Sequence, residues 1–149
     1  GSDAEGWSEH ERAILRGDGG WWLIHDRMRS AELHDYALHL QLAPDAQDRA
    51  QRVDLPDGTA AVLAPNLLIV PLAAGQASIA LDTGWVAPVY GHKLPAPRLT
   101  VSQQGGDAWF ATLLVPFSGV MPQPGFSCDG QSFAVRIDGN PAEHGRLPC

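Results

Sequence analysis

Cysteine is scarce in this sequence, where Cys128 and Cys149 are the two among 149 residues. Neither lies in a CxxC motif or in a Cys/His spacing of the kind that binds zinc. The pair could form a disulfide in an oxidising compartment, and two free thiols are an equal alternative. A chain of this length buries roughly two-thirds of its unfolded surface, so it needs neither a metal nor a disulfide merely to fold.

Long apolar runs are absent as well. The chain has no apolar stretch of about 18 residues and does not open with a basic-then-apolar segment, so we expect no membrane partner. Gly1 and Ser2 are typical of a cloning scar, so a natural export signal could have been removed. The sequence also lacks GxSxG, HExxH, P-loop and GxGxxG patterns, which argues against hydrolase, zinc protease and nucleotide chemistry. We expect no cofactor.

Positive charge is in short supply: ten lysines and arginines face seventeen aspartates and glutamates, a formal net charge of −7. Such a chain repels polyanions at long range, so we expect no nucleic acid partner. The same charge disfavours sulfated glycans, although a local basic pocket could override the average. Arg12, Arg16, Arg27 and Arg29 form such a local bias, which would suit a carboxylate-bearing glycan or the acidic face of a neighbouring domain, with a solvated face as the default.

Glycine and proline, by contrast, are plentiful. There are 16 glycines and 12 prolines, too many for long helices and well suited to turns. Short alternating segments between turn residues predict an all-β fold, specifically an antiparallel β-sandwich of about ten strands. We expect a single domain over residues 1–149, with a flexible N-terminal segment at 1–10 and an irregular C-terminal tail at 139–149.

The first predicted hairpin spans Glu11–Met28 around a Gly-Asp-Gly-Gly turn and places Trp22 and Ile24 on one face. Residues 85–97 carry three prolines and one glycine, and we expect an edge or rim loop there. Near the end of the chain, alternate residues from Trp109 to Phe117 are core candidates. Further strands are predicted at Leu33–Leu42, Thr59–Leu63, Leu67–Leu72, Ala77–Leu81, Arg98–Gln103, Asp107–Phe117 and Ser132–Asp138.

Histidine is the commonest metal ligand, and Asp26, His34 and His39 fall on neighbouring predicted strands. The strand alternation puts His34 and His39 on opposite faces, so they could share a metal only across a bulge. The simpler interpretation has His34 at the core rim and His39 solvated or hydrogen-bonded across strands. We therefore assign no metal site, and these three residues are secondary candidates.

Tyr90 and His92 flank a glycine in the proline-rich segment. A phenol and an imidazole on such a loop could pair as acid and base across a glycan chain, since polysaccharide lyases remove the proton α to a uronic carboxylate and protonate the leaving oxygen. We favour the plainer interpretation, in which Tyr90 packs against a sheet edge and His92 is a loop residue without a chemical role.

The five tryptophans would matter if the domain bound sugars, because an indole face stacks on the CH face of a pyranose. Trp21 and Trp22 are adjacent and must point to opposite sides of their strand. Because Trp22 shares a face with Ile24, we predict that it is core, which leaves Trp21 and Trp85 as exposed candidates. Exposed tryptophans also mark protein interfaces, and we favour that role for part of a larger enzyme.

Three stretches carry a family resemblance: RAILRGDGGWWLIHDRM and AELHDYALHLQLAP near the start, and WVAPVYGHKLPAPRLTVSQQGGDAWFATLLVPF later on. Together they resemble the later half of the β-sandwich domain of heparinase II/III-like polysaccharide lyases, over roughly Glu11–Phe117. The markers are an arginine-rich first strand, an aromatic-rich second strand ending in Asp26, the His34-x-x-x-x-His39 strand, and the segment from Tyr90 to LLVP.

The resemblance implies a protein that pairs a helical toroid with an antiparallel β-sandwich and binds its substrate in the cleft between them. The catalytic Tyr and Asn/His of the family's toroid, and the His-x-His element that opens its sandwich, have no counterpart here, so no residue of this chain inherits a catalytic role. We therefore expect a non-catalytic module, inactive alone, that packs on a helical toroid domain of the same or a companion chain. A periplasmic or secreted location follows from the resemblance alone.

The expected ligand is an acidic polysaccharide, and the candidate contacts are Trp21, Arg27, Trp85, Tyr90 and His92. Two alternatives remain open. One is a self-standing carbohydrate-binding module with Trp21, Trp85 and Tyr90 as its platform, and the other is a purely structural domain that caps an enzyme.

Overall fold

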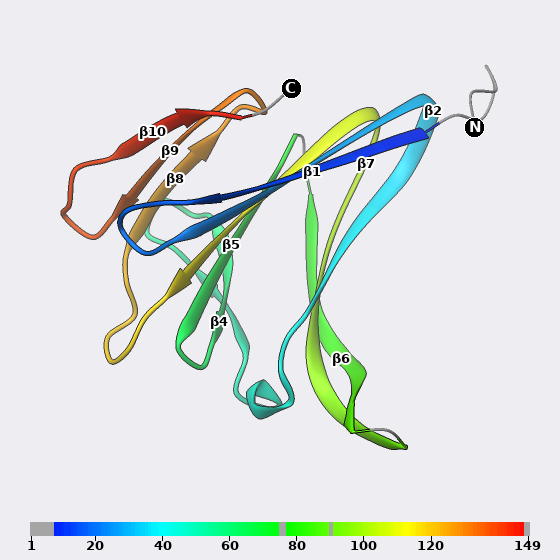
Figure 1. The fold of residues 1–149 in the computed structure, drawn as a ribbon, viewed down its shortest axis with the longest axis vertical. Coiled ribbons are helices and arrows are strands. Elements are labelled where there is room, and N and C mark those ends of the chain that lie inside the picture. The colour runs from blue at the N-terminus through cyan, green and yellow to red at the C-terminus, as the bar shows by residue number, and fades with distance from the viewer. Residues whose placement is uncertain (1–7, 75–76, 90, 148–149) are drawn as a thin grey trace.

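The computed structural model describes residues 8–74, 77–89 and 91–147, which form ten strands and one short 3₁₀ helix, η1 (Pro44–Ala46). Every strand pairing is antiparallel, and the strands form two sheets, so the predicted all-β fold of about ten strands is confirmed (Figure 1). The strands are β1 (Ser8–Arg16), β2 (Trp22–Gln41), β3 (Gln51–Asp54), β4 (Ala60–Ala64), β5 (Leu67–Ala73), β6 (Ser78–Val89), β7 (His92–Pro116), β8 (Pro124–Cys128), β9 (Ser132–Ile137) and β10 (Glu143–Arg146).

The larger sheet has seven strands in the order β1-β2-β7-β5-β4-β3, with β6 also paired to β7. Strand β7 is 25 residues long and pairs with β2 along one edge. Its other edge is shared, because β6 pairs with its first half and β5 with its second half. The smaller sheet has the order β10-β9-β8. In Figure 1 it lies beside the turn that joins β1 to β2.

One hydrophobic core lies between the two sheets. Leu23 and Leu113 of the larger sheet are fully buried there with Val135 of the smaller sheet. The predicted alternation from Trp109 to Phe117 is confirmed, because its inner members belong to this core and its two end residues pack against it. Each fully buried leucine contributes roughly 2 kcal/mol of transfer free energy, so this layer holds the two sheets together.

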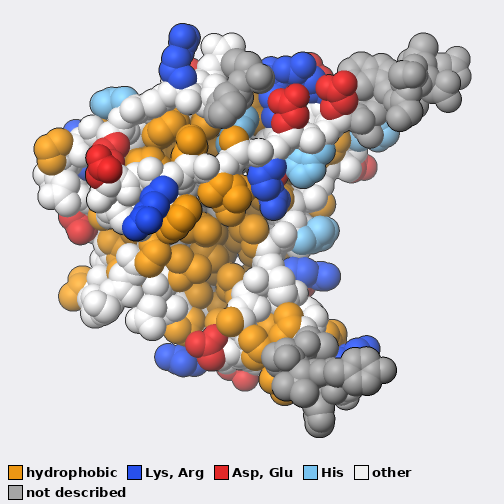
Figure 2. All heavy atoms as spheres, in the orientation of Figure 1, with side chains coloured by type: hydrophobic (Ala, Val, Ile, Leu, Met, Phe, Trp, Pro, Cys, Tyr) orange, Lys and Arg blue, Asp and Glu red, His pale blue; other side chains and the backbone are white. Residues whose placement is uncertain are grey.

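A second core lies on the opposite face of the larger sheet. Val62 and Ile69, from β4 and β5, are buried with Leu38, Leu99 and Phe110 of the long strands. Partners this far apart in the sheet can meet only because β2 and β7 bend, so the sheet folds over on itself. Figure 2 shows hydrophobic side chains gathered at the centre of the face in view.

The long strands run through positions where the sequence predicted interruptions. Strand β2 joins two predicted strands into one, and β7 passes through residues 104–106, which resembled a turn. The β2–β7 register shifts between Arg29 and His34, which marks a bulge. Glycine at two of the three β7 positions tolerates that geometry, so the chain bends and continues instead of turning back.

Ordered strands also reach into both predicted irregular ends. Strand β1 begins at Ser8, inside the segment expected to be flexible, and β10 lies inside the segment expected to be an irregular tail. The four residues of β10 have no apolar alternation, so their pairing with β9 depends on backbone hydrogen bonds that the side-chain pattern does not reveal.

The predicted exposures of Trp21 and Trp22 are wrong, because Trp21 is buried and Trp22 is exposed. Trp21 is 2% exposed and packs edge-on against Phe133 of the smaller sheet, whereas Trp22 is 39% exposed. A Cβ at Gly17 would overlap the Trp21 indole, so the glycine lets the ring fold back across the turn. Trp22 and Ile24 do share a face, but the second core does not extend far enough to cover it.

The turn between β1 and β2 is tied to the smaller sheet by Glu143. Its carboxylate accepts hydrogen bonds from the backbone N–H groups of Asp18 (2.8 Å) and Gly19 (3.3 Å) and from Nε1 of Trp21. These bonds hold the pKa of Glu143 below its ordinary value of 4.5, the Trp21 bond having the largest effect. Glu143 thus joins the C-terminal strand to the first hairpin.

Asp26 of β2 is fully buried inside the first hairpin. Its Oδ1 accepts a 2.6 Å hydrogen bond from Nε of Arg12 and lies 2.8 Å from Nε2 of His10. Both partners are about half exposed, while Oδ2 of Asp26 has no hydrogen-bond partner among the described residues. Because a buried carboxylate is costly without compensation, Arg12 and His10 stabilise the hairpin as well as the charge.

Replacing Glu143 by glutamine should lower the melting temperature by roughly 3 °C at pH 7, since charged acceptors bind N–H groups more strongly than neutral ones. A lowered folded-state pKa stabilises the fold above pH 4.5, and that contribution disappears as the pH falls through the folded value. The difference between the two proteins should therefore shrink on acidification below pH 4.5. Thermal melts followed by circular dichroism measure the difference in melting temperature. Glu32→Gln, at an exposed site, is the control, and an equal loss there would contradict the role of Glu143.

Arg12→Ala should destabilise the protein by about 2–4 kcal/mol, because it leaves a buried carboxylate without its guanidinium partner. The matched control is Arg98→Ala, which removes a pair with Asp82 whose members are 42% and 52% exposed. Exposed pairs contribute about 0–1 kcal/mol. Urea unfolding measures both changes, and equal effects would show that the burial of Asp26 is not important.

Candidate functional site

The proline-rich segment at residues 85–97 forms part of a hairpin instead of the predicted loop. Residues of β6 pair with β7 from Ser78↔Ser102 to Val86↔Leu94, and again at Val89↔His92. β2 pairs with β7 no further than Arg98, so the end of the hairpin extends past the rest of the sheet, as the lower part of Figure 1 shows. Prolines are tolerated here because this part of β7 lacks a strand on its second edge.

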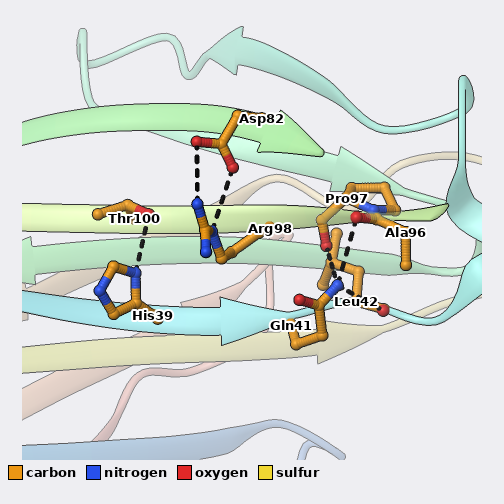
Figure 3. Close-up of polar contacts among 8 residues, drawn as sticks. All are labelled: His39, Gln41, Leu42, Asp82, Ala96, Pro97, Arg98 and Thr100. Carbon is orange, nitrogen blue, oxygen red and sulfur yellow. Dashed lines mark hydrogen bonds and ion pairs between the residues drawn. The ribbon is translucent and has the colours of Figure 1, made fainter. Parts of the chain in front are cut away.

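The base of this hairpin is fixed by side-chain contacts (Figure 3). Nε2 of Gln41 donates to the carbonyl oxygens of Ala96 (3.3 Å) and Pro97 (2.9 Å). The absence of a side chain at Gly84 makes room for this amide, since a Cβ there would lie 2.5 Å from Oε1 of Gln41. Gln41, the last residue of β2, therefore holds the hairpin at a set angle to the sheet.

Two further contacts brace the same base. Nε of Arg98 lies 3.2 Å from Oδ1 of Asp82, across the β6–β7 pair. Nδ1 of His39 lies 3.0 Å from Oγ1 of Thr100, across the β2–β7 pair. This is the cross-strand hydrogen bond that was one of the two predictions for His39. In Figure 3 these groups follow one another along three adjacent strands. They form a polar surface at the base of the hairpin.

Trp85 is the most prominent side chain of the hairpin. It is 64% exposed, as predicted, and stands opposite Pro95. Leu94, next to Pro95 in sequence, is 44% exposed. An indole on a hydrogen-bonded ribbon has only two side-chain torsions to fix when it stacks on a sugar ring or inserts into a protein surface.

The remaining predicted contacts are not brought to this hairpin. Tyr90 lies outside the described residues, and His92 begins β7 but its side chain is not described, so their pairing stays a prediction. Arg27 pairs with Glu11 and Trp109, in the other half of the sheet. Trp21 is buried and cannot be a sugar platform, which corrects that part of the prediction.

The secondary metal candidates do not converge. Asp26, His34 and His39 all lie on the single strand β2 instead of on neighbouring strands. Asp26 is buried, whereas the two histidines are exposed. Across the described ranges, no three His, Cys, Asp or Glu side chains are grouped as a metal ion would require.

Burial shifts the pKa of two further groups, the buried His25 and the half-buried Cys128. His25 is 2% exposed and its ring lies 6.3 Å from that of Trp109; burial lowers its pKa below 6.5, an effect that Asp26 opposes and Arg27 reinforces. His25 is therefore neutral at pH 7. Burial likewise raises the pKa of the Cys128 thiol. Cys149, the other cysteine, lies outside the described residues, so both alternatives for the pair stay predictions.

Sequence reasoning missed two features of the first hairpin: the buried Asp26 with its two partners, and the exposed Trp22. Counting outward from the turn would have placed Arg12 directly opposite Asp26. No local signal could have shown that Trp22 is uncovered, because that depends on where the second core ends. Within the described part of the chain, no helix is long and apolar enough to cross a membrane.

The fold is shared with solved polysaccharide lyases. Heparan sulfate lyase HepC from Pedobacter heparinus is similar with a TM-score of 0.70 and 19% identity over 95% of this chain and 24% of that chain. A structure of heparinase III gives a TM-score of 0.73 and 15% identity over 94% of this chain and 24% of that one. At these identities the likeness establishes the fold, and this chain spans about a quarter of the length of those proteins.

Sequence comparison is consistent with that fold. No curated protein matches the chain. The family model described as heparinase II/III-like, C-terminal, matches residues 4–137, which include both sheets up to the end of β9. A match over most of the chain shows membership, and the predicted resemblance is confirmed: this chain belongs to the heparinase II/III-like C-terminal domain family.

Proposed function

We propose that this chain is the non-catalytic β-sandwich module of a polysaccharide lyase that cleaves uronic-acid-containing glycans by β-elimination. In this proposal it packs on a helical toroid domain of the same or a companion chain and lines the substrate cleft. The observation that carries the proposal is the family match over residues 4–137. The shared fold with proteins named heparan sulfate lyase and heparinase III supports it.

A non-catalytic role is supported by the state of the described side chains. β-Elimination needs one group to remove the α-proton and another to protonate the leaving oxygen. Tyr36, the one tyrosine among the described residues, donates its hydroxyl to the carbonyl of Gly106 at 2.8 Å. His25 is buried in the core. Because the family resemblance places the catalytic Tyr and Asn/His on the helical domain, the acid and the base would come from that domain.

The β6–β7 hairpin is the part of the module that we assign to the cleft wall. Its base is braced by Gln41, and it presents Trp85 to solvent. Tyr90 and His92 belong to the same hairpin in sequence and remain proposed contacts. Arg27 lies in the other half of the sheet, so any contact it makes with an acidic polysaccharide would be a separate one.

A self-standing carbohydrate-binding module is a weaker alternative, because the burial of Trp21 removes one of its three platform residues. The third possibility, a purely structural cap, predicts no glycan contact at all. A periplasmic or secreted location, where polysaccharides are met, belongs to the proposal and follows from the family resemblance.

The isolated 149-residue chain should release no unsaturated uronate from heparan sulfate, alginate or glucuronan, measured by absorbance of the product. Saturable quenching of tryptophan fluorescence by a uronate glycan should accompany this. Trp85→Ala should weaken that binding by about tenfold, as expected for the loss of one stacking contact.

Trp22→Ala is the matched control, because it removes the other partly exposed tryptophan far from the hairpin and should leave glycan affinity unchanged. Product formation by the isolated chain would refute the non-catalytic role. Equal losses in the two variants would remove the hairpin from the glycan-binding surface.

A further inference from the structure

An apolar area on the first hairpin is left uncovered. Ile14 of β1 is 59% exposed and stands opposite Ile24 of β2. Trp22, 39% exposed, stands between Arg16 and Leu114 on the neighbouring strands. Directly opposed residues project from the same side of a sheet, so these five side chains form one surface, here called the first-hairpin face.

The first-hairpin face continues the second hydrophobic core outward. Leu114 packs against that core, and the residue opposite it on β5 is the buried Ile69. The exposed fraction of the side chains increases from Leu114 to Trp22 and then to Ile14 of β1, because no described layer covers these strands. Figure 2 shows basic side chains beside the hydrophobic centre of this view. Burial of the remaining apolar area would stabilise a complex.

Charge on this face is positive and unbalanced. The guanidinium carbon of Arg16 lies 5.3 Å from the ring centroid of Trp22, and among the described residues Arg16 has no carboxylate at ion-pair distance. The acid on the same face, Asp26, is buried and already held by Arg12 and His10. In a chain with a net charge of −7, a cation next to exposed aliphatic side chains suits an acidic partner.

The aliphatic content distinguishes between two kinds of partner. Sugars are bound by aromatic rings together with hydrogen-bonding groups, whereas Ile14, Ile24 and Leu114 offer neither. One face of the Trp22 indole is already occupied by Arg16. Buried apolar area with a charged rim is typical of protein interfaces. The composition of the face therefore favours a protein surface over a glycan.

We infer that the first-hairpin face is the surface on which the helical domain packs, through apolar side chains with a carboxylate set against Arg16. This inference rests on the proposed function. The matched part of the solved lyases is 24% of their chains, so proteins of this fold have ample further chain to cover such a face. The module then has separate surfaces for its two partners: the first hairpin for protein and the β6–β7 hairpin for glycan.

The first experiment compares the 149-residue chain alone with the full-length protein that the proposed function requires, in which the chain is joined to its helical domain. The signal of Trp22 is obtained as the difference between each protein and its Trp22→Phe variant, under acrylamide quenching. In the full-length protein the Trp22 quenching constant should fall at least about fivefold, because interface cores exclude solvent. The corresponding difference for Trp85→Phe should stay unchanged without glycan. Equal quenching of Trp22 in both proteins would overturn the inference.

A charge reversal tests the acidic partner. Arg16→Glu in the full-length protein should speed proteolytic separation of the two domains by about tenfold, since like charges across an interface repel. Arg146→Glu, on exposed β10 of the smaller sheet, is the control and should have no effect. The isolated domain carrying Arg16→Glu should melt as the wild type does, because Arg16 is exposed. Equal rates for the two reversals would overturn the inference.

Failure of the proposed function has a different signature. A full-length protein that shields Trp22 but yields no unsaturated uronate from the three glycans would refute lyase action and keep the docking face. A lyase in which Trp22 stays open to quencher would refute the docking face alone. A natural polypeptide and operon neighbours without any helical domain would refute both.

Discussion

The continuous backbone pairing of strand β7 is the constraint on which the rest of the structure depends. Three other strands pair with it, β2 along one edge and β5 and β6 in succession along the other. The bulge at residues 30–33 of β2 lies where β7 changes which of its residues face the second core. Phe110 faces that core on one side of the bulge and Leu99 on the other. Both halves can therefore bury apolar side chains on the same face, and the sheet folds around them. The positions of both hairpins follow from that bend.

Each of the two hairpins, β6–β7 and β1–β2, carries an exposed tryptophan and is held in place by side-chain hydrogen bonds. At the far end of β7, Gln41 ties down the β6–β7 hairpin while Trp85 stays in solvent. At the near end, Glu143 ties down the β1–β2 turn, the Asp26 cluster locks the two strands, and Trp22 stays partly in solvent. An exposed aromatic residue on a fixed support is preorganised for binding, since little freedom remains to be lost. Both ends are therefore suited to binding, and the aliphatic side chains beside Trp22 are the reason that we assign its end to protein and the Trp85 end to glycan.

Much of the architecture was readable from local patterns. The alternation from Trp109 to Phe117 predicted a buried strand because period-2 apolar residues have a single way to be covered. The prolines around Trp85 predicted an edge segment, and Trp85 is exposed there. By contrast, the exchange of Trp21 and Trp22 escaped prediction, because Trp21 precedes the regular strand and a glycine turn redirects its side chain into the inter-sheet core. The expected loop at residues 85–97 became a hairpin for a similar reason: prolines exclude a central strand but not an edge ribbon.

The sequence by itself determined the all-β class, the approximate number of strands, the first hairpin and the family, since each is encoded in short-range alternation, turn residues and recognisable segments. Tertiary structure alone decided which distant residues act together and which polar residues are buried. Asp26 is fully buried, Glu143 reaches the first turn across the two sheets, and His34 and His39 are kept apart from Asp26 along one strand. These relations depend on register, on bulges and on where a core ends, and such properties arise from the packing of the whole chain and not from any one segment.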